Sequence, residues 1–476
     1  MSPMFDLRPL AAVLLTAGVL LWRASAAGAP SFPGGFIEKS TNTAARPRLT
    51  QAQIQSFVPS GRGKFKFPAP YNTEGIRITV PSDCGGNACL FPVGYSYWSN
   101  INNHAGSDTM LIFLGLEQKY GGTGPTLFSY HKPTDEVKKL GPLFPPSSPF
   151  YSHSGDGWYF SATQPTKLYV SNNGPQLQRY DVLAKNFSTV FDVTEKFGKD
   201  KTVGQTHSSS DDRVHSGTLQ CVKAGCSDGV NTAKGDQEAM GCLVYNENTR
   251  RFSYFPKKKE FDECQIDKSG RWLFILEQWD GLHDMDNRVV DLDTGKQRTL
   301  LSNQQKILGT KFGAVVHVDM GYGYVVGGDS ADSRPYTKVV YNFAKEPLDG
   351  VLAYYATPGS ASSLLHIAHG NAKPNVLAEQ QYACGSGAGG DAGRRDEIIC
   401  FRLDGSLNAL PVAPVMTDLK ARGGDIDGGC GEYCKQPKGN IDVTGRYFIW
   451  TSNMGGNRLD AFIVKVPAQL LAPNLP

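Results

Sequence analysis

One short pattern recurs seven times along this chain of 476 residues. Each copy has a polar residue or a histidine, then a turn rich in Gly, Asp and Ser, and then a short run of β-branched or aromatic residues. The seven copies are Asn103 to Leu114, Ser152 to Ser161, Thr206 to Leu219, Gln265 to Leu276, His317 to Val326, a degenerate copy at His366 to Asn371, and Asn440 to Trp450. Their mean spacing is about 56 residues, close to the roughly 40 to 50 residues of a propeller blade once loop insertions are allowed.

The repeat predicts an all-β fold. Further strands follow within several copies, such as Leu177 to Val182 and Arg288 to Leu292, and no long run shows the 3.6-residue apolar period of a helix. We predict one closed domain, a seven-bladed β-propeller over residues 75–476. The segment Gly75 to Pro81 is expected to add a strand to the last blade, which would close the ring and protect its edges. Six or eight blades, or a pair of β-sandwiches, are the alternatives.

The N-terminus has the features of a secretory signal. Arg8 precedes an apolar run from Leu10 to Trp22, and small residues at Ala24 to Ala26 resemble a cleavage site. We therefore expect a signal peptide over 1–26, an N-terminal extension over 27–74, and a secreted or periplasmic protein. The apolar run is shorter than the roughly 18 residues needed to span a bilayer, so no membrane association is predicted.

The ten cysteines lie close together in pairs, which favours disulfides in an exported chain. Short-range pairing predicts five bridges: Cys84–Cys89, Cys221–Cys226, Cys242–Cys264, Cys384–Cys400 and Cys430–Cys434. A zinc site is the weaker alternative, because no two-residue C-x-x-C spacing occurs.

The formal net charge of +3 argues against nucleic acid as a partner, because the chain has no basic excess to displace counterions from phosphates. We expect a ligand bound at a local site, and a monomer, as is common for closed propellers.

Histidines carry the functional signal. Six of the nine lie at or next to the end of the first strand of a repeat: His104, His153, His207, His317, His366 and His369. In a propeller this strand is the innermost one, so these side chains should converge on the central channel. Any one of them alone would more often be a buried histidine bonded to a carbonyl. Six in register indicate acid–base chemistry, a metal, or both, because imidazole titrates near neutral pH and binds divalent cations.

Cationic and amide side chains accompany the histidines. Arg213, Arg288 and Arg458 lie near these turns, and a guanidinium can grip a carboxylate with two hydrogen bonds, although Arg458 reads better as a partner of its neighbouring Asp460. Further polar residues on the same expected face are Tyr151, Gln205, Gln265 and Gln381. Such a set suits an anionic sugar.

The segments Tyr151 to Ser161, His207 to Ser216 and Gln436 to Asn453 resemble the seven-bladed propeller polysaccharide lyases. These include the oligogalacturonate and ulvan lyases and the secreted rhamnosyl-glucuronate lyases. The resemblance covers architecture and site chemistry over roughly Trp98 to Pro467. It implies β-elimination next to a uronate carboxylate of an acidic polysaccharide or oligosaccharide.

The resemblance also implies roles for particular residues. For catalysis these are His104, Tyr151, His153, Arg213 and His215; for substrate binding, Gln205, Gln265 and Arg288. It further implies a divalent cation in the central channel, Ca²⁺ or Mn²⁺, held by His207, His317 and His369, with Gln381 as a further ligand. No organic cofactor is expected.

Two other classes of function stay open. A glycoside hydrolase would need two carboxylates flanking the scissile bond, and Asp211, Asp212, Asp319 and Glu379 are available. A propeller that binds glycans or proteins without catalysis is the third class, and it is favoured if the histidines are structural.

Overall fold

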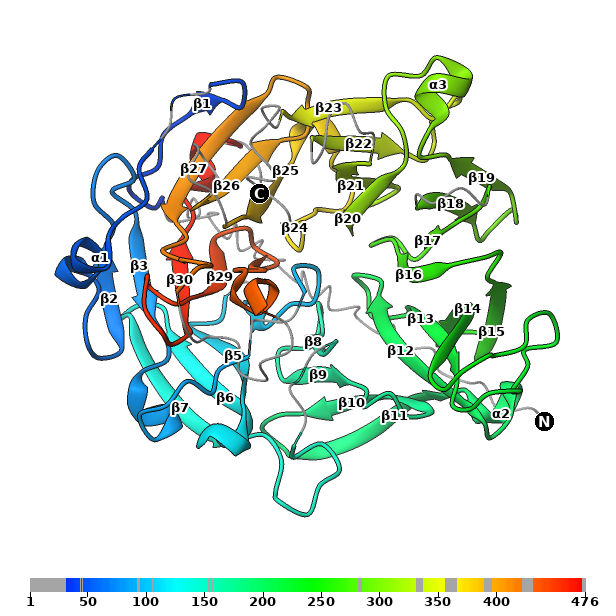
Figure 1. The fold of residues 1–476 in the computed structure, drawn as a ribbon, viewed down its shortest axis with the longest axis horizontal. Coiled ribbons are helices and arrows are strands. Elements are labelled where there is room, and N and C mark those ends of the chain that lie inside the picture. The colour runs from blue at the N-terminus through cyan, green and yellow to red at the C-terminus, as the bar shows by residue number, and fades with distance from the viewer. Residues whose placement is uncertain are drawn as a thin grey trace, which may run out of the picture.

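The computed structural model describes residues 31–42, 44, 46–91, 95–104, 106–152, 155, 157–280, 285–330, 337–355, 366–388, 396–421 and 431–472. In these residues seven antiparallel sheets follow one another around a ring, so the fold is a seven-bladed β-propeller, as the repeat predicts (Figure 1). The first strand of each repeat lies nearest the centre of the ring (Figure 1).

The first four blades use consecutive strands. They contain β4 (Ile101–Asn102), β5 (Thr109–Leu116), β6 (Gly124–His131) and β7 (Glu136–Pro142); β8 (Tyr159–Phe160), β9 (Lys167–Val170), β10 (Gln176–Asp181) and β11 (Asn186–Asp192); β12 (Lys201–Ser208), β13 (Val214–Cys221), β14 (Glu238–Asn246) and β15 (Arg251–Pro256); and β16 (Phe261–Ile266), β17 (Trp272–Glu277), β18 (Asp286–Asp291) and β19 (Gln297–Leu300).

The last three blades complete the ring. They contain β20 (Val315–Met320), β21 (Tyr324–Asp329), β22 (Lys338–Asn342) and β23 (Gly350–Tyr354); β24 (His366–Ala368), β25 (Tyr382–Ser386), β26 (Glu397–Arg402), β27 (Asn408–Pro414) and the short β1 (Glu38–Lys39); and β28 (Asn440–Ile441), β29 (Tyr447–Ser452), β30 (Asp460–Lys465), β3 (Glu74–Arg77) and β2 (Gly63–Lys66). The helices are short: α1 (Gln51–Phe57), α2 (Thr194–Phe197) and α3 (Gln304–Leu308).

The ring is closed by a strand from the beginning of the chain. β3 pairs antiparallel with β30 near the C-terminal end, and the residues predicted for this strand overlap it. β2, from the segment predicted as an extension, forms the outer edge of the same blade. Ile76, Ile112 and Ile463 are fully buried in one cluster between the last and the first blade. Apolar burial thus joins the two ends of the chain.

The hydrophobic core is distributed between neighbouring blades. Phe274 of one blade, for example, packs in a buried cluster with Val325 and Tyr341 of the next. The strands that form these contacts are apolar on both faces, because each sheet is covered by a neighbour on either side. The core therefore lies around the channel, and polar side chains are left at the centre.

Four of the predicted disulfides are present: Cys84–Cys89, Cys221–Cys226, Cys242–Cys264 and Cys384–Cys400. Cys430 of the fifth predicted pair lies outside the described residues, as does the predicted signal peptide. The four bridges fit an extracellular or periplasmic protein, since such compartments are oxidising. Among the described helices none is long and apolar enough to cross a membrane.

Candidate functional site

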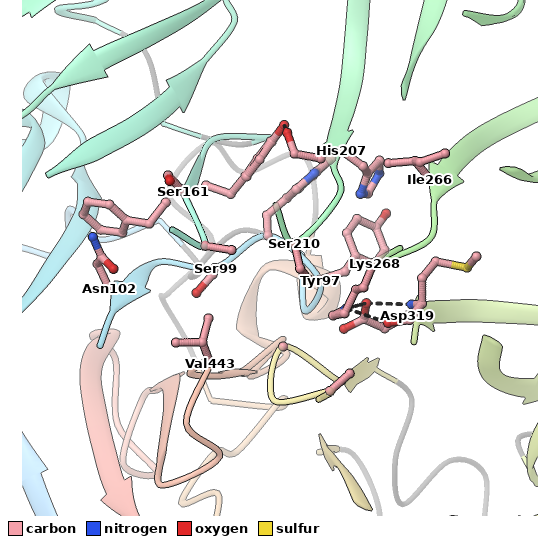
Figure 2. Close-up of a pocket in the computed structure, with 18 of the residues that line it drawn as sticks. Tyr97, Ser99, Asn102, Ser161, His207, Ser210, Ile266, Lys268, Asp319 and Val443 are labelled. Atoms are coloured by element: carbon pink, nitrogen blue, oxygen red, sulfur yellow. Dashed lines mark hydrogen bonds and ion pairs between the residues drawn. The ribbon is translucent and has the colours of Figure 1, made fainter. Parts of the chain in front are cut away.

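A pocket of about 370 Å³ lies where the inner strands end, around the axis of the ring (Figure 2). All seven blades contribute to its wall. Their contributions include, in chain order, Asn102, Tyr159, His207, Gln265, Asp319, Gly370 and Val443. The inner strands therefore do converge on one mouth, and the side chains found there define the chemistry available.

A segment that the repeat did not predict forms part of the wall. Tyr97 and Trp98, which precede β4, line the pocket and pack against the ring of His207, with Trp98 stacked on it at 5.7 Å between ring centroids. The indole of Trp98 donates a hydrogen bond to the carbonyl of Thr206, and the hydroxyl of Tyr97 donates one to Glu263. Burial raises the pKa of Glu263 to about 7. The chain before β4 thus fills part of the channel with aromatic rings.

His104 lines the pocket, as the repeat predicts. Partial burial lowers the pKa of its imidazole, and the nearby charge of Asp212 only partly opposes this effect. Asp212 accepts a hydrogen bond from the hydroxyl of Ser161, and the backbone of Ser161 bonds the imidazole of His104. His104 is therefore a neutral, oriented base near pH 7.

Tyr159 is one of three tyrosines that line the pocket, with Tyr97 and Tyr322. Burial raises its pKa above the usual range for a tyrosine, so the hydroxyl keeps its proton. Its oxygen lies 2.7 Å from the hydroxyl oxygen of Ser208, which also lines the pocket. The repeat gives no correct signal for Tyr159, because it places the innermost strand before the turn, whereas β8, the innermost strand of this blade, follows the turn.

Two lysines and one aspartate carry the charge of the pocket wall among the described lining residues. Lys268 lies beside Asp319 (Figure 2), with Nζ 3.2 Å from its carboxylate, and it donates to the carbonyl of Met320. Lys373 donates to the carbonyl of Val443 at 3.1 Å, and burial lowers its pKa. The wall is thus net positive by one charge, which suits an anionic ligand.

His207 and Gln265 add neutral polar groups. Complete burial lowers the pKa of His207 to about 3, so its ring is uncharged at all moderate pH values. Its Nε2 atom has no hydrogen-bond partner within the described part of the chain. Gln265 donates from its amide to Glu263 at 2.9 Å. These two residues can position a ligand but cannot act as acids.

Both arginines assigned to the substrate carboxylate lie outside the pocket wall. Arg213 is exposed on the turn after β12 and donates to Asn248 at 2.7 Å. Arg288 is buried within its blade, 2.6 Å from the carboxylate of Glu277. Its charge is satisfied there, because a buried guanidinium is stable only with such a partner.

Three other predicted residues, Tyr151, Gln205 and His215, are not in the pocket wall. The carbonyl of Tyr151 accepts a hydrogen bond from Gln118, and its phenol is not among the lining groups. The amide oxygen of Gln205 accepts from Thr218 at 2.8 Å. His215 lies behind Ser208, fully buried. His153 lies outside the described residues.

β-bulges account for two misplaced members of the predicted set, Gln205 and His317. Gln205 and His317 have positive φ angles of 45° and 48°, each at an irregularity in the pairing of its inner strand. A bulge inserts extra residues and reverses which side chains face the channel. The lining positions are instead His207 and Asp319, two residues later. A strict alternation read from the sequence cannot show this shift.

The residues present do not fit the implied metal site. His207 stacks on Trp98, whereas His317 packs against Tyr95 and His366. Both ring nitrogens of His369 already make hydrogen bonds, to Tyr324 at 2.6 Å and to Asn371 at 3.2 Å. The described residues contain no group of three or more His, Cys, Asp or Glu side chains able to hold a metal ion. The three histidines thus form separate contacts rather than one ligand set.

Gln381, the fourth implied ligand, is committed to the backbone of the loop that follows β24. Its amide oxygen accepts from the N–H of Lys373 at 2.7 Å, and its amide nitrogen donates to the carbonyl of Val376 at 2.8 Å. The side chain therefore holds the loop that carries Lys373 into the pocket.

No protein-family profile and no curated protein matches this sequence. Among solved structures, the oligogalacturonate lyase of Vibrio parahaemolyticus has a TM-score of 0.57 at 11% identity, over 86% of this chain and 98% of that one. An oligogalacturonate lyase in complex with manganese has a TM-score of 0.55 at 12% identity, over 87% and 98% of the two chains. At such identities the likeness shows a shared propeller fold.

Proposed function

We propose that this protein is a polysaccharide lyase that cleaves a uronic-acid glycoside by β-elimination. The observation that carries the proposal is the combination of a neutral base, His104, and a protonated phenol, Tyr159, in one pocket with two lysines. The similar fold of two oligogalacturonate lyases supports this reaction class.

The chemistry requires three functions. The C5 proton of a uronate is weakly acidic, so the enzyme has to stabilise the charge that develops on the carboxylate. Lys268 and Lys373 are the cations of the pocket wall, and they take the place that the sequence assigned to arginines. His104 then removes the C5 proton, and Tyr159 protonates the departing glycosidic oxygen. The C5–H electron pair forms the C4=C5 double bond as the C4–O bond breaks.

A hydrolase fits this pocket less well. Hydrolysis with an acid and a base or nucleophile needs two carboxylates about the scissile bond. Among the described lining residues Asp319 is the one carboxylate, and it is held by Lys268 and by the backbone N–H groups of Met320 and His369. Asp211, Asp212 and Glu379 are not in the wall.

The substrate class follows from the charge of the pocket and from the resemblance of the sequence. We propose an acidic oligosaccharide or polysaccharide, with a rhamnosyl-glucuronate as the first candidate and an oligogalacturonate as the second. The pocket encloses about 370 Å³, enough for one or two sugar rings, so a chain end or a short oligosaccharide fits it best.

The test is incubation of the purified protein with a panel of uronate-containing glycans, with absorbance in the near ultraviolet followed over time. Elimination creates an unsaturated uronate that absorbs, and we expect this signal with at least one glycan of the panel. New reducing ends without absorbance would show hydrolysis instead. Binding without either product would show the non-catalytic alternative.

A further inference from the structure

Behind the pocket wall, four side chains of two neighbouring blades form a continuous line of hydrogen bonds. The Tyr159 and Ser208 hydroxyl oxygens are 2.7 Å apart, and Ser208 Oγ is 2.7 Å from His215 Nδ1. On the opposite side of the imidazole, Nε2 of His215 lies 2.8 Å from the carboxylate of Glu247. The line therefore leads from the pocket through the third blade to its outer side.

The position of each member on its strand explains the geometry. Ser208 ends β12 and His215 belongs to β13, and the two residues are direct partners in the antiparallel pairing. Tyr159 lies on β8, the inner strand of the preceding blade. Glu247 directly follows β14. The arrangement is thus built on strands rather than on loops, which keeps the distances fixed.

The last two members of the line differ in solvent exposure. His215 has no exposed side-chain surface, whereas the side chain of Glu247 is 29% exposed. Contacts with His215 and Arg179 lower the pKa of Glu247 against the opposing effect of burial, so Glu247 is a carboxylate at working pH. Glu247 lies where its carboxylate can balance the charge of the His215 ring while that ring carries a second proton.

We propose that Ser208, His215 and Glu247 form a proton relay behind Tyr159, in which the imidazolium of His215 replaces, through Ser208, the proton that Tyr159 gives to the leaving oxygen. This inference rests on the proposed function. In this proposal Ser208, His215 and Glu247 act through Tyr159. His215 therefore does not contact the substrate directly.

The proton balance closes within the site. When the C4–O bond breaks, Tyr159 gives its proton to the glycosidic oxygen and receives one from Ser208, and Ser208 receives one from Nδ1 of His215. His104 holds the proton taken from C5. After product departure His104 loses that proton to water, and water in the pocket reprotonates His215 through Tyr159 and Ser208. No tyrosinate persists at any point, which matters because burial makes that anion unfavourable.

Charged and titratable groups around the relay are few. Arg179 on β10 pairs with Glu247 and also donates to the hydroxyl of Tyr169 on β9. The ring of Tyr169 lies 5.4 Å from that of His215. Asp212 contributes its charge to Tyr159 and Tyr169. Tyr245 on β14 is the direct strand partner of His215, and the ring of Phe191 lies 6.4 Å from that of His215.

The experiment compares Ser208→Ala and Glu247→Gln with a matched control, Glu238→Gln. Glu238 begins the same strand, β14, has a 27% exposed side chain and pairs with Lys257 at 2.9 Å, so its replacement removes a similar ion pair away from the relay. With a uronate glycan that the wild type eliminates, we expect kcat to fall about 100-fold in Ser208→Ala with KM little changed. Glu247→Gln should also lower kcat, because the His215 ring loses the carboxylate that balances its charge during the transfer.

A solvent-isotope measurement separates a relay from simple positioning. The wild-type rate in mixtures of light and heavy water should depend nonlinearly on deuterium content, because several protons move together, and this curvature should disappear in Ser208→Ala. Elimination that Ser208→Ala and Glu247→Gln leave unchanged, or a loss of kcat that Glu238→Gln reproduces equally, would overturn the relay. Far-ultraviolet circular dichroism of each variant establishes that it is folded, and Glu247→Gln, at a partly exposed position, serves if Ser208→Ala does not fold.

A readout without catalysis keeps the two proposals separate. Nitrogen-15 spectra of the histidine rings, with His215 assigned by its loss in His215→Gln, should show a ring proton protected from exchange that shifts in Glu247→Gln but not in Glu238→Gln. A protected, shifting proton in a protein that eliminates no uronate would overturn the lyase proposal and leave the line of hydrogen bonds as a structural feature. An active lyase whose His215 ring exchanges freely and ignores Glu247 would sink the relay alone.

Discussion

Burial has opposite consequences for the two reactive side chains of the pocket. It lowers the pKa of the His104 imidazole and raises that of the Tyr159 phenol, because in each case the charged form is disfavoured away from water. One group is thereby kept ready to accept a proton and the other to donate one. At the scale of single residues, the site separates base and acid by environment rather than by residue type alone.

His104→Ala should lower the rate of elimination by about 100- to 10,000-fold, the range typical for loss of a positioned base. The initial rate of near-ultraviolet absorbance measures this effect. Partly exposed His131, whose ring bonds Thr134 and does not line the pocket, provides the control variant His131→Ala, which should keep full activity. Unchanged activity in His104→Ala would remove His104 from the mechanism.

The acid limb of kcat/KM should lie below about pH 6.5, the usual pKa of histidine. Since burial lowers the pKa of His104, its neutral form persists to more acidic pH than that of a free imidazole, and activity is lost only when the pH falls through the lowered value. Initial rates at low substrate between pH 4 and 8 measure the limb. A limb above pH 6.5 would contradict the assignment of His104 as the base.

At the scale of elements, loops and cross-links fix what the inner strands present. Gln381 ties the loop after β24 by bonds to the backbone of Lys373 and Val376, and this loop brings Lys373 into the pocket. Cys242 on β14 and Cys264 on β16 join two neighbouring blades. The Gln381 hydrogen bonds position a loop, and the disulfide positions one blade against the next. Strand pairing within a blade fixes neither of these positions.

Gln381→Ala should raise KM for a uronate glycan about tenfold and leave kcat within a few-fold. The reason is that the variant loosens the position of the Lys373 charge without removing a reacting group. Steady-state kinetics separate the two constants. Lys373→Met should produce a KM effect at least as large, and a Gln381→Ala effect confined to kcat would contradict the positioning role.

Removal of the bridge between blades, in the double variant Cys242→Ala and Cys264→Ala, should lower the free energy of unfolding by about 3 kcal/mol on a chain-entropy estimate. The loop it closes spans 22 residues in sequence. The bridge Cys221–Cys226 closes only 5 and should be worth about 2 kcal/mol on the same estimate. Thermal or denaturant unfolding of the two double-alanine variants measures which bridge contributes more to the free energy of unfolding. A larger loss on removal of Cys221–Cys226 would contradict the prediction.

At the scale of the whole molecule, the channel of a closed ring keeps imidazoles away from water. Burial lowers the pKa of both His207 and His369 to about 3, with the charge of Lys268 acting in the same direction. In the unfolded chain both would titrate near 6.5. The folded state therefore holds fewer protons than the unfolded state between these values.

Stability should accordingly fall as the pH drops below about 6.5, by up to about 1.4 kcal/mol per pH unit for each of the two histidines until the folded pKa is reached. Denaturant unfolding at a series of pH values between 4 and 7 measures this slope. The variant His369→Asn should reduce this slope near pH 5 by about 1.4 kcal/mol per pH unit, which corresponds to one bound proton. A slope unaffected by this change would show that His369 is protonated in the folded state.

Local pattern determined much of this protein: the seven repeats, the closing strand, four disulfide pairs and the approach of His104, His207 and Gln265 to one pocket. These depend on periods and short spacings, which the sequence contains directly. Tertiary structure alone decided the rest. Bulges in β12 and β20 changed which side chains face the channel, and Arg288 found its partner Glu277 inside its own blade. The pairing of Tyr159 with Ser208 joins different blades, and contacts of this kind are set by packing between distant segments, which no local pattern records.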